Sequence, residues 1–148
     1  MVIESLKSLF NRDLNKLKDE IEAYQNEGQL WVIDKSISNS AGNLCLHLIG
    51  NLNTYIGAEL GKTGYIRNRP LEFSEKDIPK DQLISKIDET ILVINRVLDS
   101  LSETDLEVIY PQIVFEKEMT TGFFLIHLST HLAYHLGQIN YHRRLLDF

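Results

Sequence analysis

Four stretches of this 148-residue chain place apolar residues at the three- and four-residue spacing of an amphipathic helix, and this pattern limits the fold more than any other feature. The spacing predicts helices over residues 2–26, 40–60, about 78–101 and 121–146. Ser40 is a favourable N-cap for the second helix, and Pro79 is tolerated in the first turn of the third. Four such helices, each with one apolar stripe, predict an all-α four-helix bundle.

Two connections break the helical pattern. Residues 61–76 contain too many Gly, Arg, Asn and Pro residues for a helix, and residues 106–119 have a β-like composition interrupted by Pro111. Connections longer than about 12 residues are uncommon in compact domains unless they have a role. We therefore expect both to be long crossovers or short hairpin-like strands that cover one end of the bundle. No repeat or linker divides the chain, so residues 1–148 are expected to form a single domain.

Composition excludes several classes of protein. A net charge of −6 argues against a nucleic-acid partner, because phosphate binding needs a basic surface. No stretch approaches the roughly 18 consecutive apolar residues that a membrane span requires, so no membrane partner is expected. Cys45 is the only cysteine, which suits a reducing cytoplasm, and it is expected to be a small core residue. We expect a cytoplasmic protein.

The last predicted helix contains a stripe of histidines in the segment HLSTHLAYHLGQINYHRR. At about 100° per residue, His127, His131, His135, Gln138 and His142 fall within an arc of roughly 80° beside the apolar face. Two histidines four residues apart can bind one divalent ion. Only one adjacent pair can do so here, either 127/131 or 131/135, and the periodicity does not choose between them.

A metal ion with an open catalytic position usually has three protein ligands, so another helix should supply the third. His47 is the only histidine outside the last helix. Asn43, Asn51 or Gln138 could fix the tautomer of a ligating imidazole through its second nitrogen. His142 is expected near the helix end, where its cation would suit the helix dipole.

Two arginines in the first irregular connection have two interpretations. Arg67 and Arg69 could clamp a substrate carboxylate, because guanidinium groups match its geometry. They could instead form a surface ion pair with Glu72. The sequence does not favour either interpretation.

The segments GNLCLHLIGNL and HLAYHLGQI resemble those of the DinB-like metal-binding four-helix bundles, and YIRNRPLEF resembles the subgroup named domain of unknown function 1572 (DUF1572). In that superfamily one ligand lies on the second helix and two on the last, the second shortly before a Gly-Gln pair. The resemblance therefore implies His47, His131 and His135 as ligands, and leaves His127 to border the pocket. It also implies a bundle with long crossovers and, often, a homodimer.

The resemblance implies a Zn²⁺ or Ni²⁺ ion, with Fe or Mn compatible with the same ligands. Characterised relatives include transferases that use low-molecular-weight thiols and some metal-dependent hydrolases. Our leading hypothesis is a metalloenzyme in which the ion activates a thiol cosubstrate or water toward a small electrophilic substrate. The alternative is a non-catalytic metal-binding or stress-related interaction module, with a structural, sensing or relict site.

Overall fold

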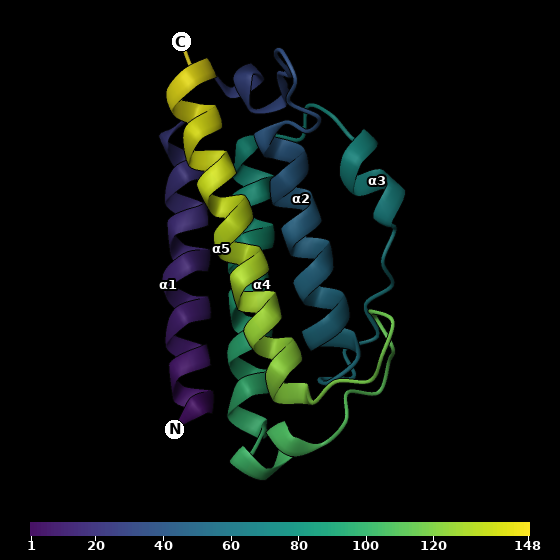
Figure 1. Ribbon diagram of the computed structural model, residues 1–148. Coiled ribbons are helices and arrows are strands. Elements are labelled where there is room, and N and C mark those ends of the chain that lie inside the picture. Colours follow the sequence, from purple (N-terminus) through teal and green to yellow (C-terminus); the bar gives the residue numbers. More distant parts are fainter.

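The computed structural model describes residues 1–148 as an all-helical bundle (Figure 1). Short helical turns flank the long helices. The α-helices are α1 (Val2–Ala23), α2 (Ala41–Leu52), α3 (Arg69–Ser74), α4 (Lys80–Ser100) and α5 (Thr121–Leu146), the 3₁₀ turns are η1 (Glu27–Trp31) and η3 (Glu103–Glu107), and the π-helical turn η2 is Asn53–Ala58. The prediction of an all-α four-helix bundle is confirmed, with α3 as an addition to it.

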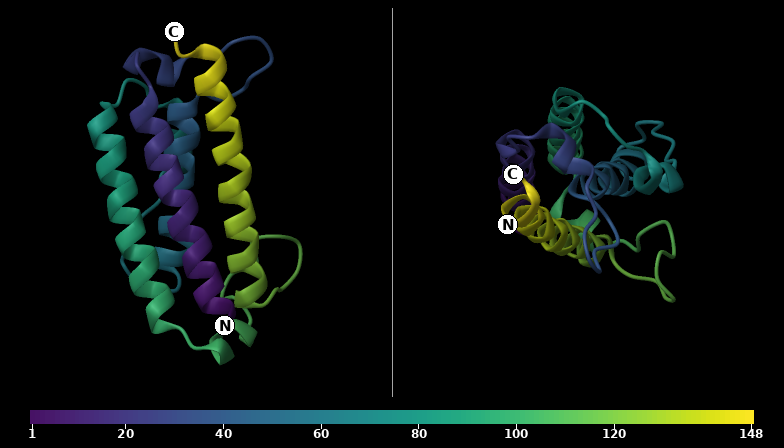
Figure 2. Two further views of the ribbon diagram at one scale, coloured as in Figure 1. Left: turned by 90° about the vertical axis from the view of Figure 1, so that its left-hand side faces the viewer. Right: turned by 90° about the horizontal axis from the view of Figure 1, so that it is seen from above.

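Helices α1 and α5 run in one direction along the bundle, and α2 and α4 run in the other (Figures 1 and 2). Helix α1 packs against α4 and α5, and α2 packs against the same two helices. Because α2 and α4 are parallel, the chain between them must return along the whole length of the bundle. This return is the predicted long crossover, and it carries α3 along the outer side of α2.

The two irregular connections differ from the sequence-based expectation. The first contains α3, because the Asn68 side chain accepts a hydrogen bond from the Leu71 amide and Pro70 occupies the first turn, where no amide donor is needed. It lies along the side of α2, so the expectation that it covers one end of the bundle is wrong. The second contains only an isolated bridge between Ile109 and Thr120, so the expected hairpin of strands is absent.

Helix α2 is buried on every side, from Ala41 to Leu52. Helices α4 and α5 cover its inner faces, and the crossover with α3 covers its outer face. The expectation of a single apolar stripe is therefore wrong for this helix. Polar residues on α2 must find partners inside the protein, since water does not reach them.

The helical pattern of residues 40–60 is interrupted by η2. Its wider turn leaves backbone carbonyl groups without regular helical partners. The Tyr110 hydroxyl donates to the Tyr55 carbonyl at 2.6 Å and satisfies one of them. Segments of π-helix are frequent near functional sites, and Tyr55 lines the cavity described below.

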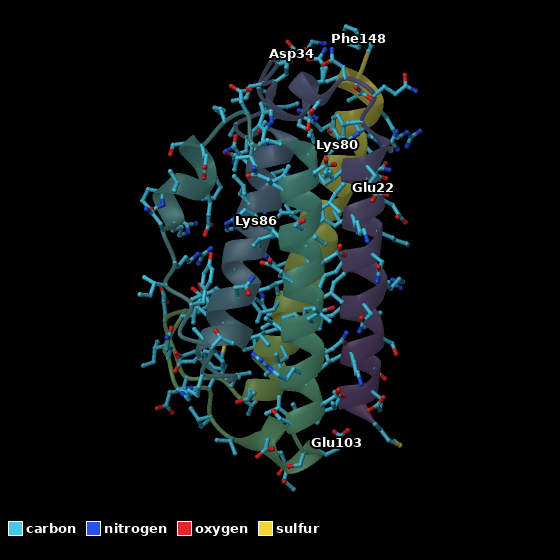
Figure 3. The ribbon with its side chains drawn as sticks, turned by 180° about the vertical axis from the view of Figure 1, so that it is seen from behind. Glu22, Asp34, Lys80, Lys86, Glu103 and Phe148 are labelled. Atoms are coloured by element: carbon cyan, nitrogen blue, oxygen red, sulfur yellow. The ribbon has the colours of Figure 1, made fainter.

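Helix α1 ends at Ala23, three residues before the predicted end. The Lys80 ammonium, at the start of α4, donates to the carbonyl oxygens of Glu22 and Tyr24 at 3.2 and 3.0 Å (Figure 3). These bonds satisfy carbonyl groups at the end of α1 that have no partner within the helix. At the opposite end of the bundle, Glu103 accepts hydrogen bonds from the amino terminus and the Ile3 amide. No helix is long and apolar enough to cross a membrane.

Replacing Gly42 with Ala should destabilise the protein by about 1–3 kcal/mol, because the new methyl group would lie 2.6–2.8 Å from the indole of buried Trp31. Trp31 is the only tryptophan, so urea unfolding followed by its fluorescence measures the change directly. Gly137→Ala is the matched control, since a methyl group there meets nothing within 4 Å. A Gly42→Ala variant as stable as the wild type would contradict this packing.

Candidate metal centre

Three histidines from two helices meet on the inner side of α2. His47 lies on α2, and His131 and His135 lie one turn apart on α5. One ring nitrogen of each lies within 4.8 Å of the others. The centre of the His47 ring is 5.1 Å from that of His131 and 5.3 Å from that of His135. The structure thus brings together the three residues that the resemblance implies as ligands.

A buried carboxylate orients His47. The His47 Nδ1 lies 3.0 Å from Oε1 of Glu72, a residue of α3 that is 6 % exposed. The Arg67 guanidinium binds the same carboxylate through Nε at 2.8 Å and Nη2 at 3.0 Å. Since Glu72 accepts, His47 donates from Nδ1 and its Nε2 lone pair points toward α5. Burial alone would raise the pKa of Glu72, but hydrogen bonds from His47 and Arg67 lower it, so the carboxylate stays ionised.

Burial favours the neutral form of the two triad histidines on α5. Burial lowers the pKa of His131 to about 4, and the neighbouring His135 and His47 contribute. Burial also lowers the pKa of His135, whose Nδ1 donates to the Gln138 Oε1 at 2.7 Å. The bond to Gln138 leaves Nε2 of His135 free, and the bond to Glu72 leaves Nε2 of His47 free in the same way. Gln138 therefore lies where its predicted tautomer-fixing role requires.

The arrangement fits a divalent metal ion. Bond lengths of about 2.0–2.1 Å in a tetrahedral site place two ligand nitrogens roughly 3.3–3.4 Å apart. The Nε2 atoms of His47 and His131 are 3.3 Å apart. Nδ1 of His131 is buried without a partner, so nothing else in the protein fixes this ring through its second nitrogen. Three imidazole ligands suit Zn²⁺ or Ni²⁺, and also Fe or Mn.

Two residues of α2 position Glu72. Gly50 leaves the space that the carboxylate occupies, because an added Cβ would lie 2.6 Å from the Glu72 Cδ. Asn43 donates to the carbonyl oxygens of Glu72 and Glu75 at 3.0 and 2.8 Å. The Asn43 amide holds α3 against α2, and of the three predicted alternatives it is Gln138 that contacts an imidazole. The sequence predicts Glu72 only as a partner for arginine, and its hydrogen bond to His47 is an addition.

A cavity of about 190 Å³ opens beside His47 and His131. Aromatic rings and two arginines form its walls, which comprise His47, Asn51, Tyr55, Arg67, Arg69, Val114, Phe115, Phe124, His127, Leu128 and His131. Asn51 is 7 % exposed, and its Oδ1 has no hydrogen-bond partner. It makes no hydrogen bond with an imidazole, so its predicted role there stays a prediction. Both irregular connections contribute to this cavity.

The two arginines differ in their surroundings. Arg67 forms the ion pair with Glu72 that the sequence suggested, and the pair is buried and not on the surface. Arg69 has no carboxylate partner, and its Cζ lies 5.3 Å from the centre of the Phe73 ring. The same Phe73 ring lies 4.9 Å from the His47 ring.

The remaining histidines lie outside the triad. His127 borders the cavity, and its ring centre is 6.4 Å from that of His131. His142 is buried, with Nδ1 2.6 Å from the Tyr24 hydroxyl and Nε2 2.8 Å from the Val32 carbonyl. A carbonyl only accepts, so Nε2 carries the proton and Tyr24 donates to Nδ1. The expected position of His142 near the helix end is confirmed, and there its buried ring joins α5 to the end of α1.

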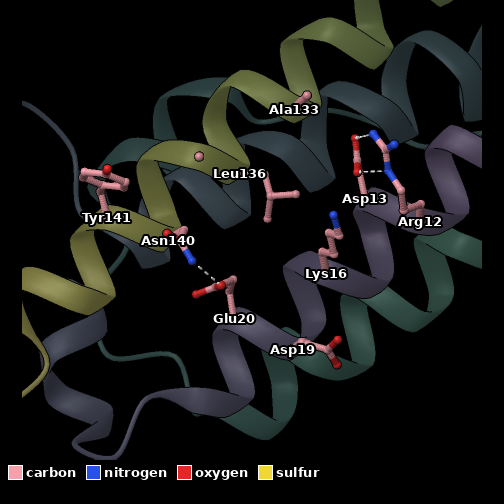
Figure 4. Close-up of a pocket in the computed structure, with 10 residues that line it drawn as sticks. Arg12, Asp13, Lys16, Asp19, Glu20, Ala133, Leu136, Asn140 and Tyr141 are labelled. Atoms are coloured by element: carbon pink, nitrogen blue, oxygen red, sulfur yellow. Dashed lines mark hydrogen bonds and ion pairs between the residues drawn. The ribbon is translucent and has the colours of Figure 1, made fainter.

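Two larger cavities lie along α5. One of about 520 Å³ borders His135 and Gln138 on the side of α5 away from Arg69, and Leu44, Tyr134 and Leu145 contribute apolar walls. The other, about 550 Å³, is an open groove between α1 and α5 (Figure 4). In this groove Arg12 pairs with Asp13 and Asn140 donates to Glu20, and no imidazole lines it.

Gly50→Ala should displace the Glu72 carboxylate from His47 and weaken Zn²⁺ binding about 10- to 100-fold, the usual effect of losing such a partner. Glu72→Gln, which keeps the shape and removes the charge, should act in the same direction. Isothermal titration with Zn²⁺ measures both, and Gly137→Ala is again the control, with wild-type affinity expected. Unchanged affinity in Gly50→Ala would contradict the orienting role of Glu72.

Comparisons with known proteins identify a family and a similar fold. No curated protein matches the chain. Its fold is similar to that in the crystal structure of a conserved protein from Enterococcus faecalis, with a TM-score of 0.76 and 16 % identity over 97 % of this chain and 95 % of that chain. A family model described as a protein of unknown function (DUF1572) matches residues 2–147. The chain therefore belongs to the DUF1572 family.

Proposed function

We propose that this protein is a divalent-metal-dependent enzyme of the DinB-like type, in which His47, His131 and His135 hold the ion. The observation that carries the proposal is the convergence of three ring nitrogens within 4.8 Å, from two helices. Two of the three rings have their Nδ1 engaged by an acceptor, Glu72 or Gln138. Their Nε2 lone pairs are therefore available for a ligand.

Zn²⁺ or Ni²⁺ is the proposed ion. When bound, such an ion lowers the pKa of a coordinated water or thiol and so supplies a nucleophile at neutral pH. The proposed reaction is attack of that thiol or water on a small electrophilic substrate. This covers thiol transfer and hydrolysis, the two reaction classes that the family resemblance implies.

The 190 Å³ cavity offers no aliphatic hydroxyl or thiol nucleophile, whereas Ser36 and Ser38 line the cavity on the His135 side. Cys45 is fully buried, and burial raises its thiol pKa to about 12, which confirms its place as a core residue. No serine, threonine or cysteine lines the 190 Å³ cavity. A nucleophile supplied from solution is consistent with this lining.

The surroundings of the triad support binding of two reactants. The cavity with Arg69 lies on the His47 and His131 side, and the apolar cavity lies on the His135 side. Phe115 and Phe124 contribute aromatic rings to the first cavity. A thiol and an electrophile could thus approach the triad from different sides.

Protein purified without a histidine tag should take up about one Zn²⁺ or Ni²⁺ per chain. His47→Ala, His131→Ala and His135→Ala should each lose at least about 100-fold in affinity, since each removes one of three ligands. His127→Ala is the matched control, because it removes a histidine of the same stripe that lies outside the triad. Elemental analysis and titration measure both quantities. Wild-type affinity in the triad variants would overturn the proposal.

Removal of the ion with a chelator separates this proposal from a purely structural site. A core of 31 buried apolar residues holds the bundle together, so we expect the metal-free protein to keep its helical circular dichroism and to rebind the ion. Unfolding on chelation would instead indicate a structural ion. Metal uptake without activity toward any thiol and electrophile pair would favour a sensing module.

A further inference from the structure

We propose that the 190 Å³ cavity beside the triad binds the carboxylate of a small, planar organic anion, with Arg69 as its ionic partner. This inference rests on the proposed function, because it names the substrate class for the same site. It goes beyond the metal triad, because it rests on Arg69 and Asn51. Binding of a metal ion by the imidazoles does not explain why these two residues lie in the cavity.

The charged side chains that line the cavity are all basic. None of its eleven lining residues is acidic. The charge of Arg67 is balanced by Glu72, which binds both Nε and Nη2 of its guanidinium. Arg69 lines the cavity and has no carboxylate partner. The cavity therefore carries one uncompensated positive charge in a protein whose net charge is −6. One guanidinium matches a single carboxylate in charge and shape.

The position of Arg69 is tied to the triad. Its Cζ lies 5.3 Å from the centre of the Phe73 ring, which in turn lies 4.9 Å from the His47 ring. A ring face attracts the guanidinium without neutralising its charge. The free edge of the guanidinium is thus left for an anion next to His47.

A second observation points to a polar ligand. Asn51 lines the cavity, is 7 % exposed, and has a buried Oδ1 without a partner. A buried acceptor without a partner is unfavourable unless a ligand or water satisfies it. A ligand that carries a hydroxyl or N–H group near its carboxylate would satisfy both Asn51 and Arg69.

The walls limit the body of the ligand. Tyr55, Phe115 and Phe124 present aromatic rings to the cavity, and Phe124 packs against Tyr55 at 5.1 Å and Phe115 at 6.2 Å between ring centres. Aromatic walls favour planar, unsaturated groups. At 190 Å³ the space is below the roughly 300–1,000 Å³ of sites for drug-sized ligands, so the ligand is small.

Benzoate and benzamide provide a matched pair of probes, because they share a shape and differ in charge. We expect metal-free wild-type protein to bind benzoate with a millimolar or tighter Kd in a ¹H–¹⁵N titration, and benzamide more weakly. Arg69→Gln should weaken benzoate binding at least about fivefold and leave benzamide unchanged. Arg96→Gln is the control, since Arg96 is exposed on α4, has no carboxylate partner and lies outside the cavity.

Circular dichroism establishes that Arg69→Gln is folded. Equal binding of benzoate by wild type and Arg69→Gln, an equal loss in Arg96→Gln, or no binding at all would overturn the assignment. Because the titration uses metal-free protein, it is independent of the metal. Arg69-dependent benzoate binding in a chain that takes up no ion would contradict the proposed metalloenzyme and keep the anion site. Metal uptake without Arg69-dependent binding would do the reverse.

Discussion

The hydrogen bond from His47 to the buried Glu72 is the interaction on which the rest of the site depends. It joins α2 to α3 through two residues that are 25 apart in sequence, and it places an ionised carboxylate inside the protein. A buried charge is costly unless it is paired and hydrogen-bonded. Arg67 supplies the pair, Asn43 holds the backbone that carries Glu72, and Gly50 leaves the necessary space. The position of α3 beside α2, the burial of α2 on all sides and the direction of the His47 lone pair are parts of one arrangement.

The histidine stripe of α5 shows how one sequence period can serve two purposes. His131 and His135 lie where α5 faces the middle of α2, so their nitrogens meet His47. His142 lies two turns further on, where α5 faces the end of α1, and its nitrogens are satisfied by Tyr24 and Val32. The neighbouring helix, and not the stripe itself, decides whether an imidazole is left with a free lone pair.

Much of the fold follows from local sequence. The predicted bounds of α5 are confirmed as Thr121–Leu146, and Ser40 caps α2 by accepting from the Asn43 amide. Apolar periodicity and caps act within a few residues, so a sequence reports them directly. The short α3 was missed because Asn68 and Pro70 suggest an irregular loop unless they are read as a cap and a first turn. The π-helical turn η2 and the full burial of α2 depend on tertiary contacts that no local pattern encodes.

The sequence predicts the three proposed metal ligands of the candidate site but not the carboxylate partner of His47. Histidine spacing and family resemblance indicate His47, His131 and His135, which the structure brings together. The partner of His47 could not be identified, because Glu72 reaches it across a crossover whose path the sequence leaves open. A glycine one turn after His47 and an acidic residue beside two arginines were the available signals, namely Gly50 and Glu72 near Arg67 and Arg69.

The tautomers of the histidines test the central claim most directly. A long-range ¹H–¹⁵N spectrum of the metal-free protein at neutral pH should show His47 and His135 protonated at Nδ1, and His142 protonated at Nε2 as an internal contrast. One equivalent of Zn²⁺ should then shift the imidazole nitrogens of His47, His131 and His135, and leave those of His142 unchanged. A His47 ring protonated at Nε2, or Zn²⁺-induced shifts confined to His127 or His142, would contradict the account.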